Sequence, residues 1–173
     1  MVMLLLVTAF TSCNQGPSLQ TYYVDNELKP GFASFDVPTS FIDVDAIEMT
    51  DEQREAYESV NKLNVLTYIE ENTDDEAYKL ELEKVKVILK NPKYEELMRG
   101  GSPTDGKFVV KFLGDTENID ELVVFGSANN KGFMIARILG DDMSASKLMS
   151  LQSVLQNAKF EDMQLDGLTD FFK

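Results

Sequence analysis

Three closely spaced stretches decide the fold: Lys107-Phe-Val-Val-Lys-Phe-Leu113, Glu121-Leu-Val-Val-Phe-Gly126 and Gly132-Phe-Met-Ile-Ala-Arg-Ile-Leu139. They are rich in β-branched and aromatic residues, which is typical of β-strands. The connections between them are short, whereas a parallel crossover needs about a dozen residues or more. We therefore expect three antiparallel strands, with residues 127–131 as the hairpin loop between the last two.

Elements upstream of these strands alternate between strand and helix. Residues 31–37 and 64–70 have the composition of strands. Between them, Thr50 and Gln53 form a capping-box pattern, which predicts a short helix running to about Val60. A second capping-box pattern at residues 73–76 predicts a longer helix with an apolar stripe, made of Tyr78, Leu82, Val85 and Leu89.

The longer helix should end at Asn91-Pro92, because proline cannot continue a helix. Residues 94–99 are expected to add one more helical turn, and the glycine-rich residues 100–106 a loop. A final helix is expected over residues 144–156, followed by an apolar tail at 158–173. The predicted fold is an α+β two-layer sandwich, with helices packed on one face of a mostly antiparallel sheet.

Cys13 is the only cysteine in the chain, and it ends an apolar run that starts at Met1. The run is too short for a membrane span, which needs roughly 20 residues, but it suits the apolar region of a secretory signal. With Thr11 and Ser12 before the cysteine, it resembles a bacterial lipobox, although no Lys or Arg precedes Lys29 and the true start codon could lie upstream. We expect a signal peptide at 1–12, a lipidated Cys13 with a flexible linker over 13–28, and a single domain over 29–173.

Composition excludes several classes of function. The net charge of −14 opposes binding to nucleic acid, because phosphate backbones are themselves negative. The chain contains no histidine, which removes the usual general base and the commonest metal ligand. Lipidation would also consume the only thiol, so we expect no catalytic residues, no bound cofactor and no metal site.

Charge is unevenly distributed along the chain. Residues 79–99 contain six basic and four acidic side chains, whereas residues 25–58 contain ten carboxylates against Lys29 and Arg54. The pattern has two interpretations: a polarised surface that orients a partner, or solvated faces around one core.

Two motifs are candidates for a catalytic or a cation-binding site. Ser144-Ala-Ser-Lys147 matches the S-x-x-K nucleophile signature, and Ser127-Ala-Asn129 imitates its S-x-N companion, but their order is reversed and no K-T-G follows. A serine N-cap with a solvent-facing lysine explains the first motif. An acidic cluster could hold a hard cation such as calcium, although helix capping accounts for part of it; its members are Glu70, Glu71, Asp74, Asp75 and Glu76.

The stretch Val87-Ile-Leu-Lys-Asn-Pro-Lys-Tyr-Glu-Glu-Leu-Met98 resembles the domain-of-unknown-function 4252 family of Bacteroidetes lipoproteins. So do Glu121-Leu-Val-Val-Phe-Gly126 and Lys131-Gly-Phe-Met-Ile-Ala-Arg-Ile-Leu-Gly-Asp-Asp142, and the likeness spans roughly residues 61–155. The resemblance implies a Gram-negative envelope lipoprotein of unassigned activity, and it supplies no functional residues. No acidic residues directly follow Cys13, so the outer membrane's periplasmic face is the expected location rather than the cell surface.

Together these features favour a lipid-anchored, non-catalytic binding or scaffolding module. Its expected partners are the membrane, through the lipid on Cys13, and another envelope protein. A small carboxylate- or metal-dependent hydrolase acting on envelope glycans is the first alternative. An accessory of envelope-stress signalling is the second. The sequence gives no indication of the oligomeric state.

Overall fold

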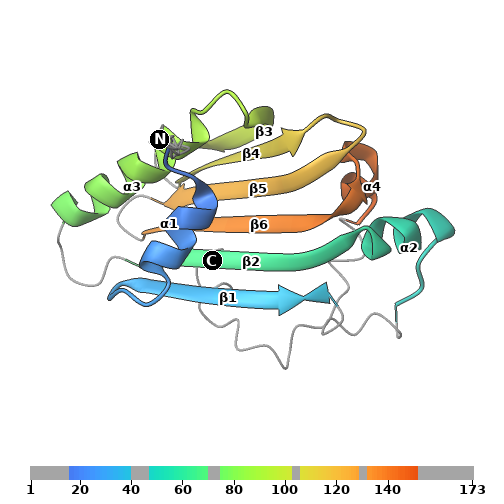
Figure 1. Ribbon diagram of the computed structural model, residues 1–173, viewed down its shortest axis with the longest axis horizontal. Coiled ribbons are helices and arrows are strands. Elements are labelled where there is room, and N and C mark those ends of the chain that lie inside the picture. The colour runs from blue at the N-terminus through green and yellow to red at the C-terminus, as the bar shows by residue number, and fades with distance from the viewer. Residues whose placement is uncertain (1–15, 40–46, 70–74, 103–105, 129–131, 152–173) are drawn as a thin grey trace, which may run out of the picture.

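The computed structural model describes residues 16–39, 47–69, 75–102, 106–128 and 132–151 (Figure 1). Within these ranges one sheet contains the strands β1 (Phe32–Pro38), β2 (Val60–Ile69), β3 (Glu95–Ser102), β4 (Gly106–Gly114), β5 (Ile119–Ala128) and β6 (Gly132–Met143). The helices are α1 (Leu19–Asn26), α2 (Asp51–Glu58), α3 (Asp75–Leu89) and α4 (Ala145–Ser150). The strand order is β1-β2-β6-β5-β4-β3, and every neighbouring pair is antiparallel. The predicted α+β class and antiparallel sheet are therefore confirmed.

Local sequence signals account for most of these elements. The Thr50 hydroxyl accepts a hydrogen bond from the Gln53 amide at 3.2 Å, and the Gln53 side chain accepts one from the Thr50 amide at 2.9 Å, which completes the predicted capping box of α2. Strands β1, β2, β4, β5 and β6 and helix α3 also lie where the sequence predicts them. The capping residues predicted for α3 begin at Thr73, which lies outside the described residues.

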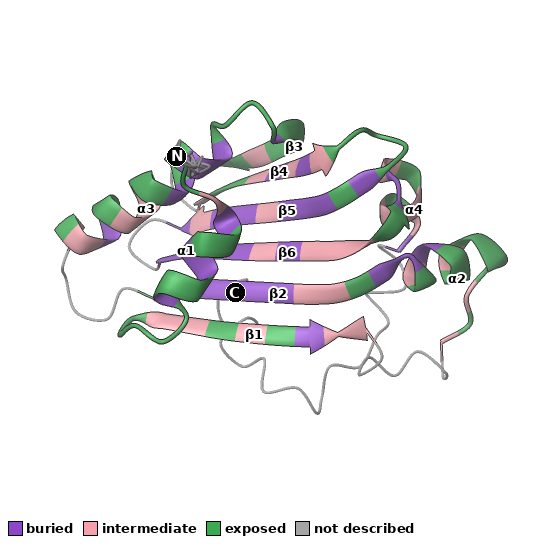
Figure 2. Cartoon of the chain, viewed as in Figure 1, coloured by how far each residue is buried: buried purple, intermediate pink, exposed green. Residues whose placement is uncertain are grey.

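One face of the sheet carries the larger apolar cluster and is covered by α1 and α3 (Figure 1). Side chains alternate between the two faces along each strand, so Val123 and Phe125 of β5 point to this face, as do Phe133 and Ile135 of β6. Phe133 has no exposed surface and lies among aromatic rings. Figure 2 shows the resulting concentration of buried residues in the central strands.

The opposite face carries a second, smaller cluster at the other end of the sheet. Its members on the strands include Val110, Phe112 and Leu122, which alternate with residues of the first cluster. Ala56 of α2 is fully buried there, and the partly buried Leu148 of α4 packs against the same cluster. Helices α2 and α4 contact each other, so they close this end of the sheet. The structure thus contains the expected helical layer on one face of the sheet. In addition, it has a pair of helices on the opposite face, which the sequence did not predict.

The helical turn predicted over residues 94–99 is wrong, as is much of the loop predicted over 100–106. Residues 95–102 form strand β3, which pairs with β4 along its length and contains a bulge between Glu96 and Met98. The two glycines allow β4 to approach closely. A Cβ atom on Gly101 would lie 2.2 Å from the carbonyl oxygen of Gly106, and one on Gly100 would lie 2.6 Å from the Phe108 ring. These glycines therefore serve a close strand contact rather than a turn.

Helix α1 lies where the sequence predicts a flexible linker, so the prediction is wrong for residues 19–26. Ser18 caps the helix by accepting a hydrogen bond from the Thr21 amide at 3.1 Å. Four positions with helical spacing are buried against the sheet and α3: Leu19, Tyr22, Tyr23 and Asn26. Two of the four are tyrosines and one is an asparagine. The mean hydropathy of this segment therefore does not reveal that one face of the helix is buried.

The end of the chain is described only in part. Helix α4 lies within the range 144–156 predicted for the final helix, and the rest of that range and the tail at 158–173 lie outside the described residues. Among the helices that the structure describes, none has the length and apolar character needed to cross a membrane.

Candidate functional site

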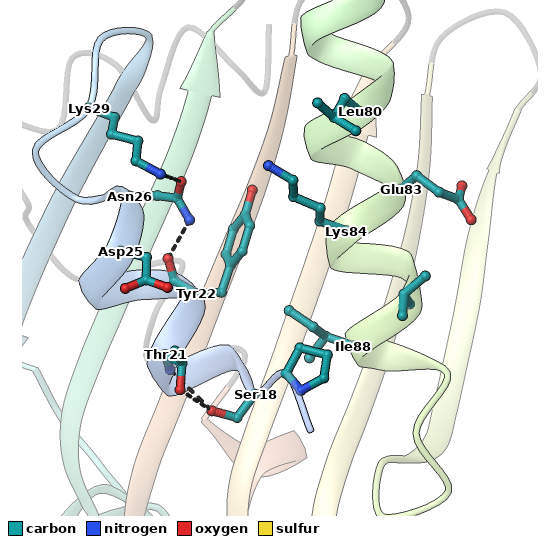
Figure 3. Close-up of a pocket in the computed structure, with 12 residues that line it drawn as sticks. Ser18, Thr21, Tyr22, Asp25, Asn26, Lys29, Leu80, Glu83, Lys84 and Ile88 are labelled. Atoms are coloured by element: carbon teal, nitrogen blue, oxygen red, sulfur yellow. Dashed lines mark hydrogen bonds between the residues drawn. The ribbon is translucent and has the colours of Figure 1, made fainter. Parts of the chain in front are cut away.

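Helices α1 and α3 enclose a groove of about 450 Å³ (Figure 3). Its apolar lining comes mainly from α3, where Leu80 and Val87 are about half exposed and Ile88 is buried. Its charged lining is balanced, with Asp25 and Glu83 against two lysines, Lys29 and Lys84. The α1–α3 groove therefore carries no net charge that would attract a charged ligand.

Several polar groups of the α1–α3 groove are hydrogen-bonded to one another at α1, as Figure 3 shows. The Asn26 side chain donates to the Tyr22 carbonyl at 2.6 Å and accepts from the Lys29 ammonium at 3.0 Å. The Tyr22 hydroxyl donates to the Glu81 carboxylate at 2.9 Å, which ties α1 to α3. The Tyr22–Glu81 hydrogen bond therefore makes the groove a contact region between the two helices.

A second and larger groove, of about 840 Å³, lies between α3 and strands β3 and β4. Its charged lining consists of six cations and the single carboxylate of Glu96. The cations are Lys79, Lys86, Lys90, Arg99, Lys107 and Lys111. We call this site the basic groove. Its net positive lining is notable because the whole chain has a charge of −14.

The helical wall of the basic groove combines an apolar and a basic stripe. Leu82 and Leu89 are seven residues apart and face the sheet, where they join the main core cluster. Lys79 and Lys86 have the same spacing beside them, and Lys90 follows one turn later. Lysines near the C-terminus of α3 also compensate the negative end of the helix dipole. The lysines consequently lie along one side of the helix, next to its buried face.

The register of the strands determines which side chains form the strand wall of the basic groove. Lys107, Val109 and Lys111 alternate along β4 and therefore share the face that α3 covers. Across the sheet, Val109 pairs with Arg99 of β3 and with Phe125 of β5, so all three side chains lie on that face. The floor of the basic groove is thus apolar, formed by Val109 and Phe125 from the sheet and the two leucines from α3.

The cations of the basic groove differ in how they are held. Glu96 accepts two hydrogen bonds from the Arg99 guanidinium, and this interaction lowers the pKa of the Glu96 carboxyl. Lys111 donates to the Tyr94 carbonyl at 3.0 Å, and the Lys90 ammonium lies 3.6 Å from the Glu83 carboxylate. Lys86 and Lys107 form no ion pair with any carboxylate that the structure describes. Their charges are therefore available to an incoming anion.

A buried ion pair lies under the start of α1. The Arg137 guanidinium donates to the Glu121 carboxylate at 2.6 Å, and both side chains are less than a tenth exposed. Arg137 also donates to the Gln20 side chain at 2.8 Å and lies 5.3 Å from the centre of the Tyr23 ring. Burial opposes charge on Arg137, yet the hydrogen bond and attraction of Glu121 raise its pKa. The pair joins α1 to two central strands and does not face either groove.

Burial raises the pKa of three tyrosines in this layer. Desolvation is the main cause for each; for Tyr22 the Glu81 carboxylate adds to it, whereas for Tyr23 the Arg137 charge opposes it. For Tyr94, burial and the nearby Glu121 carboxylate raise the pKa to about 12. The hydroxyls of these residues are held in the neutral form at physiological pH.

The raised tyrosine pKa values predict a loss of stability at alkaline pH. An acid with a raised folded-state pKa stabilises the fold fully below its unfolded pKa, which is about 10 for tyrosine. That contribution is lost as the pH rises through the folded-state pKa, which is about 12 for Tyr94. We expect the tyrosinate absorbance of the native protein to lag behind that of the urea-unfolded protein between these values. A Tyr94→Phe variant should lack one late-titrating component, and coincident native and unfolded titrations would contradict the prediction.

The candidate residues for lipidation and for a cation lie mostly outside the described residues. These are Cys13 and the acidic residues at 70–74, and the side chain of Asp75 is not described either. Glu76 is exposed at the beginning of α3. In the part of the chain that the structure describes, no three Asp, Glu or Cys side chains are placed to hold a metal ion together.

The S-x-x-K motif has a structural role. The Ser144 hydroxyl caps α4 by accepting a hydrogen bond from the Lys147 amide at 3.3 Å. The Lys147 ammonium lies 2.9 Å from the Glu55 carboxylate on α2 and donates to the Asp142 carbonyl at 3.2 Å. Ser127 lies in β5, and Asn129 is outside the described residues. The serine and lysine thus fasten α4 to its neighbours.

The basic groove is the site that sequence reasoning did not identify. The excess of basic residues at 79–99 is a partial signal, but it includes Lys84 and Lys93, which do not line the groove. It also omits Lys107 and Lys111, because strand pairing brings them into the groove from another part of the chain. Recognising the groove required knowing that residues 95–102 form a strand.

The family resemblance is confirmed by comparison with known proteins. Residues 23–151 match the family described as Domain of unknown function (DUF4252). Neither a curated protein nor a solved structure shows a significant match to the chain. The matched range contains all six strands described above, the helices α2, α3 and α4, and all six cations of the basic groove. Because the match covers most of its residues, the chain belongs to the DUF4252 family.

Proposed function

We propose that this protein is a lipid-anchored, non-catalytic module of the cell envelope that binds an anionic partner in the basic groove. The observation that carries the proposal is the gathering of six cations around an apolar floor in a chain of net charge −14. Two of these cations, Lys86 and Lys107, have no carboxylate partner among the described residues. An anion that enters the groove would therefore relieve repulsion between like charges.

The electrostatics of the chain favour selective binding at this site. Positive charge concentrated in one groove attracts and orients an anion, while the net acidic remainder of the chain repels it elsewhere. The absence of histidine, together with the commitment of Cys13 to a lipid, supports binding rather than catalysis. The charge distribution and the lack of these catalytic side chains both favour a module that binds a partner.

The position of α1 supports a short connection to the membrane. Only residues 14–18 separate Cys13 from the first residue of α1, Leu19. At about 3.5 Å per residue, such a segment spans no more than roughly 20 Å. A lipid on Cys13 would hold the domain beside the bilayer on the periplasmic face of the outer membrane. Two or three acyl chains would make this attachment stable, because one chain alone binds reversibly.

The anchor is tested at Cys13. In the native protein, we expect mass spectrometry to find an acylated Cys13 as the first residue of the mature chain. A Cys13→Ala variant should lose the acyl mass and leave the membrane fraction. A native protein that retains residues 1–12, or that carries no lipid, would contradict the lipoprotein assignment.

The groove is tested by reversing its charge. In the Lys86→Glu/Lys107→Glu double variant we expect affinity for a polyanionic probe such as poly-L-glutamate to fall by about tenfold or more. Raising the ionic strength should weaken binding by the wild type, since exposed charges are screened within about 10 Å at 0.1 M salt. The measurement is fluorescence anisotropy on the detergent-solubilised lipoprotein.

The matched control reverses two cations outside the basic groove, Lys29 and Arg54. The Lys29→Glu/Arg54→Glu variant has the same net charge as the groove variant and should retain most of the affinity. Equal losses in the two double variants would show that net charge rather than the basic groove determines binding, which would contradict the proposal.

A further inference from the structure

We infer that the anion bound in the basic groove is an acidic segment of a partner polypeptide, with apolar side chains between its carboxylates. This inference rests on the proposed function and narrows it to one class of ligand. It follows from three observations: the length over which the cations are distributed, the apolar floor of the groove, and the contacts that Glu96 makes in the groove.

The cations extend too far for one small anionic group to use them all. Lys79 on α3 and Lys90, the residue that directly follows α3, are eleven residues apart, which corresponds to about 17 Å at 1.5 Å per residue. On the opposite wall, Lys107 and Lys111 are separated by about 13 Å along β4. One carboxylate or phosphate reaches only the cations beside it. The arrangement therefore suits a ligand that carries several negative charges along an extended length.

The apolar floor favours a ligand that is not polar throughout. The groove is also lined by Leu82, Leu89, Val109 and Phe125, of which Leu82 and Val109 are only partly buried. An acidic glycan would cover this surface with hydroxyl groups and would gain little from apolar burial. A peptide can place a carboxylate at each wall and an apolar side chain on the floor. Lys107, Val109 and Lys111 face the groove at every second position of β4, so an apolar position lies between two cations along this wall.

The basic groove already contains one carboxylate, that of Glu96, which is hydrogen-bonded to a cation of the groove. Glu96 receives two hydrogen bonds from Arg99, and it lies opposite Lys111 in the β3–β4 register. Arg99 favours such planar, two-point recognition of carboxylates. A volume of about 840 Å³ also places the groove among sites that hold a ligand or a short peptide segment.

The inference is tested with defined peptides on the full lipoprotein in detergent. The probe is a fluorescein-labelled 12-residue peptide in which Glu alternates with Leu. A Glu–Ser peptide of the same length keeps the charge and removes the apolar side chains, and a Lys–Leu peptide reverses the charge. We expect the Glu–Leu peptide to bind at least tenfold more tightly than either of the others. The Lys86→Glu/Lys107→Glu variant should lose this binding, while the Lys29→Glu/Arg54→Glu variant keeps it.

Two further probes separate this inference from the proposed function: polygalacturonate as an acidic glycan, and phosphatidylglycerol in mixed detergent micelles as an anionic lipid. If either binds through the basic groove and the Glu–Leu peptide does not, the peptide inference is overturned and the anion-binding function stands. Equal affinities for the Glu–Leu and Glu–Ser peptides would also overturn it, because the apolar floor would then contribute nothing. If none of the anionic probes depends on Lys86 and Lys107, both proposals fail.

Discussion

Replacing Glu121 with alanine is expected to lower the free energy of unfolding by about 3–5 kcal/mol, because it leaves the Arg137 charge buried without its partner. The guanidinium is 2.6 Å from the Glu121 carboxylate, and its other close contacts are Gln20 and the Tyr23 ring. Neither of these is negatively charged, so neither replaces the carboxylate. A single domain is typically stable by about 5–15 kcal/mol, so the variant should be close to unfolding.

Urea unfolding followed by circular dichroism measures this loss, since the chain has no tryptophan to report it by fluorescence. A Glu121→Leu/Arg137→Met double variant is the control. It removes both charges together, and buried pairs replaced by apolar residues are often neutral in stability. The double variant should therefore be more stable than Glu121→Ala. A Glu121→Ala variant that unfolds at the wild-type urea concentration would show that the buried pair is not coupled as the structure indicates.

Replacing Phe133 with alanine is expected to cost about 3–5 kcal/mol, the range for removing a large buried aromatic side chain. Phe133 has no exposed surface, and four aromatic rings have their centres within 6.3 Å of its own. These rings come from β1, β2, α3 and β5, and the nearest is Tyr68 at 5.4 Å. The cavity would therefore open where four elements meet, and none of them can close it alone.

The same urea titration tests this prediction with two reference variants. Phe133→Leu keeps part of the volume and should cost less than the alanine variant. Leu28→Ala removes a side chain that is 94% exposed, so its effect should stay within about 0.5 kcal/mol. If Phe133→Ala and Leu28→Ala unfold at the same urea concentration, the residue is not at the centre of the core.

The capping and periodicity signals in the sequence predicted most of the elements correctly because they act over a few residues. Thr50 and Gln53 satisfy the backbone at the start of α2 within one turn, as their spacing predicts. The apolar stripe of α3 survives folding, with Val85 and Leu89 buried and Leu82 partly buried. The strands β4, β5 and β6 were recognisable for the same reason, since their composition and close spacing leave few alternatives.

Residues 94–102 show where local signals fail. Leu97 and Met98 favour a helix by intrinsic propensity, and Gly100 and Gly101 favour a loop. Pairing with β4 overrides both preferences, because backbone hydrogen bonds to a partner strand are worth more than a weak local preference. Helix α1 was missed for a related reason: its buried face includes polar residues whose partners, such as the Ile135 carbonyl for the Tyr23 hydroxyl, are distant in sequence.

The sequence by itself therefore determined the fold class, the family resemblance and the expectation of a lipidated Cys13, since each depends on residue types at short spacing. Only the tertiary structure decided the basic groove and the buried Arg137–Glu121 pair. The groove needs Lys86, Arg99 and Lys107 on one face of the sheet, and that follows from the register of β3 and β4 beneath α3. Register depends on contacts among segments far apart in the chain, and no local pattern encodes them.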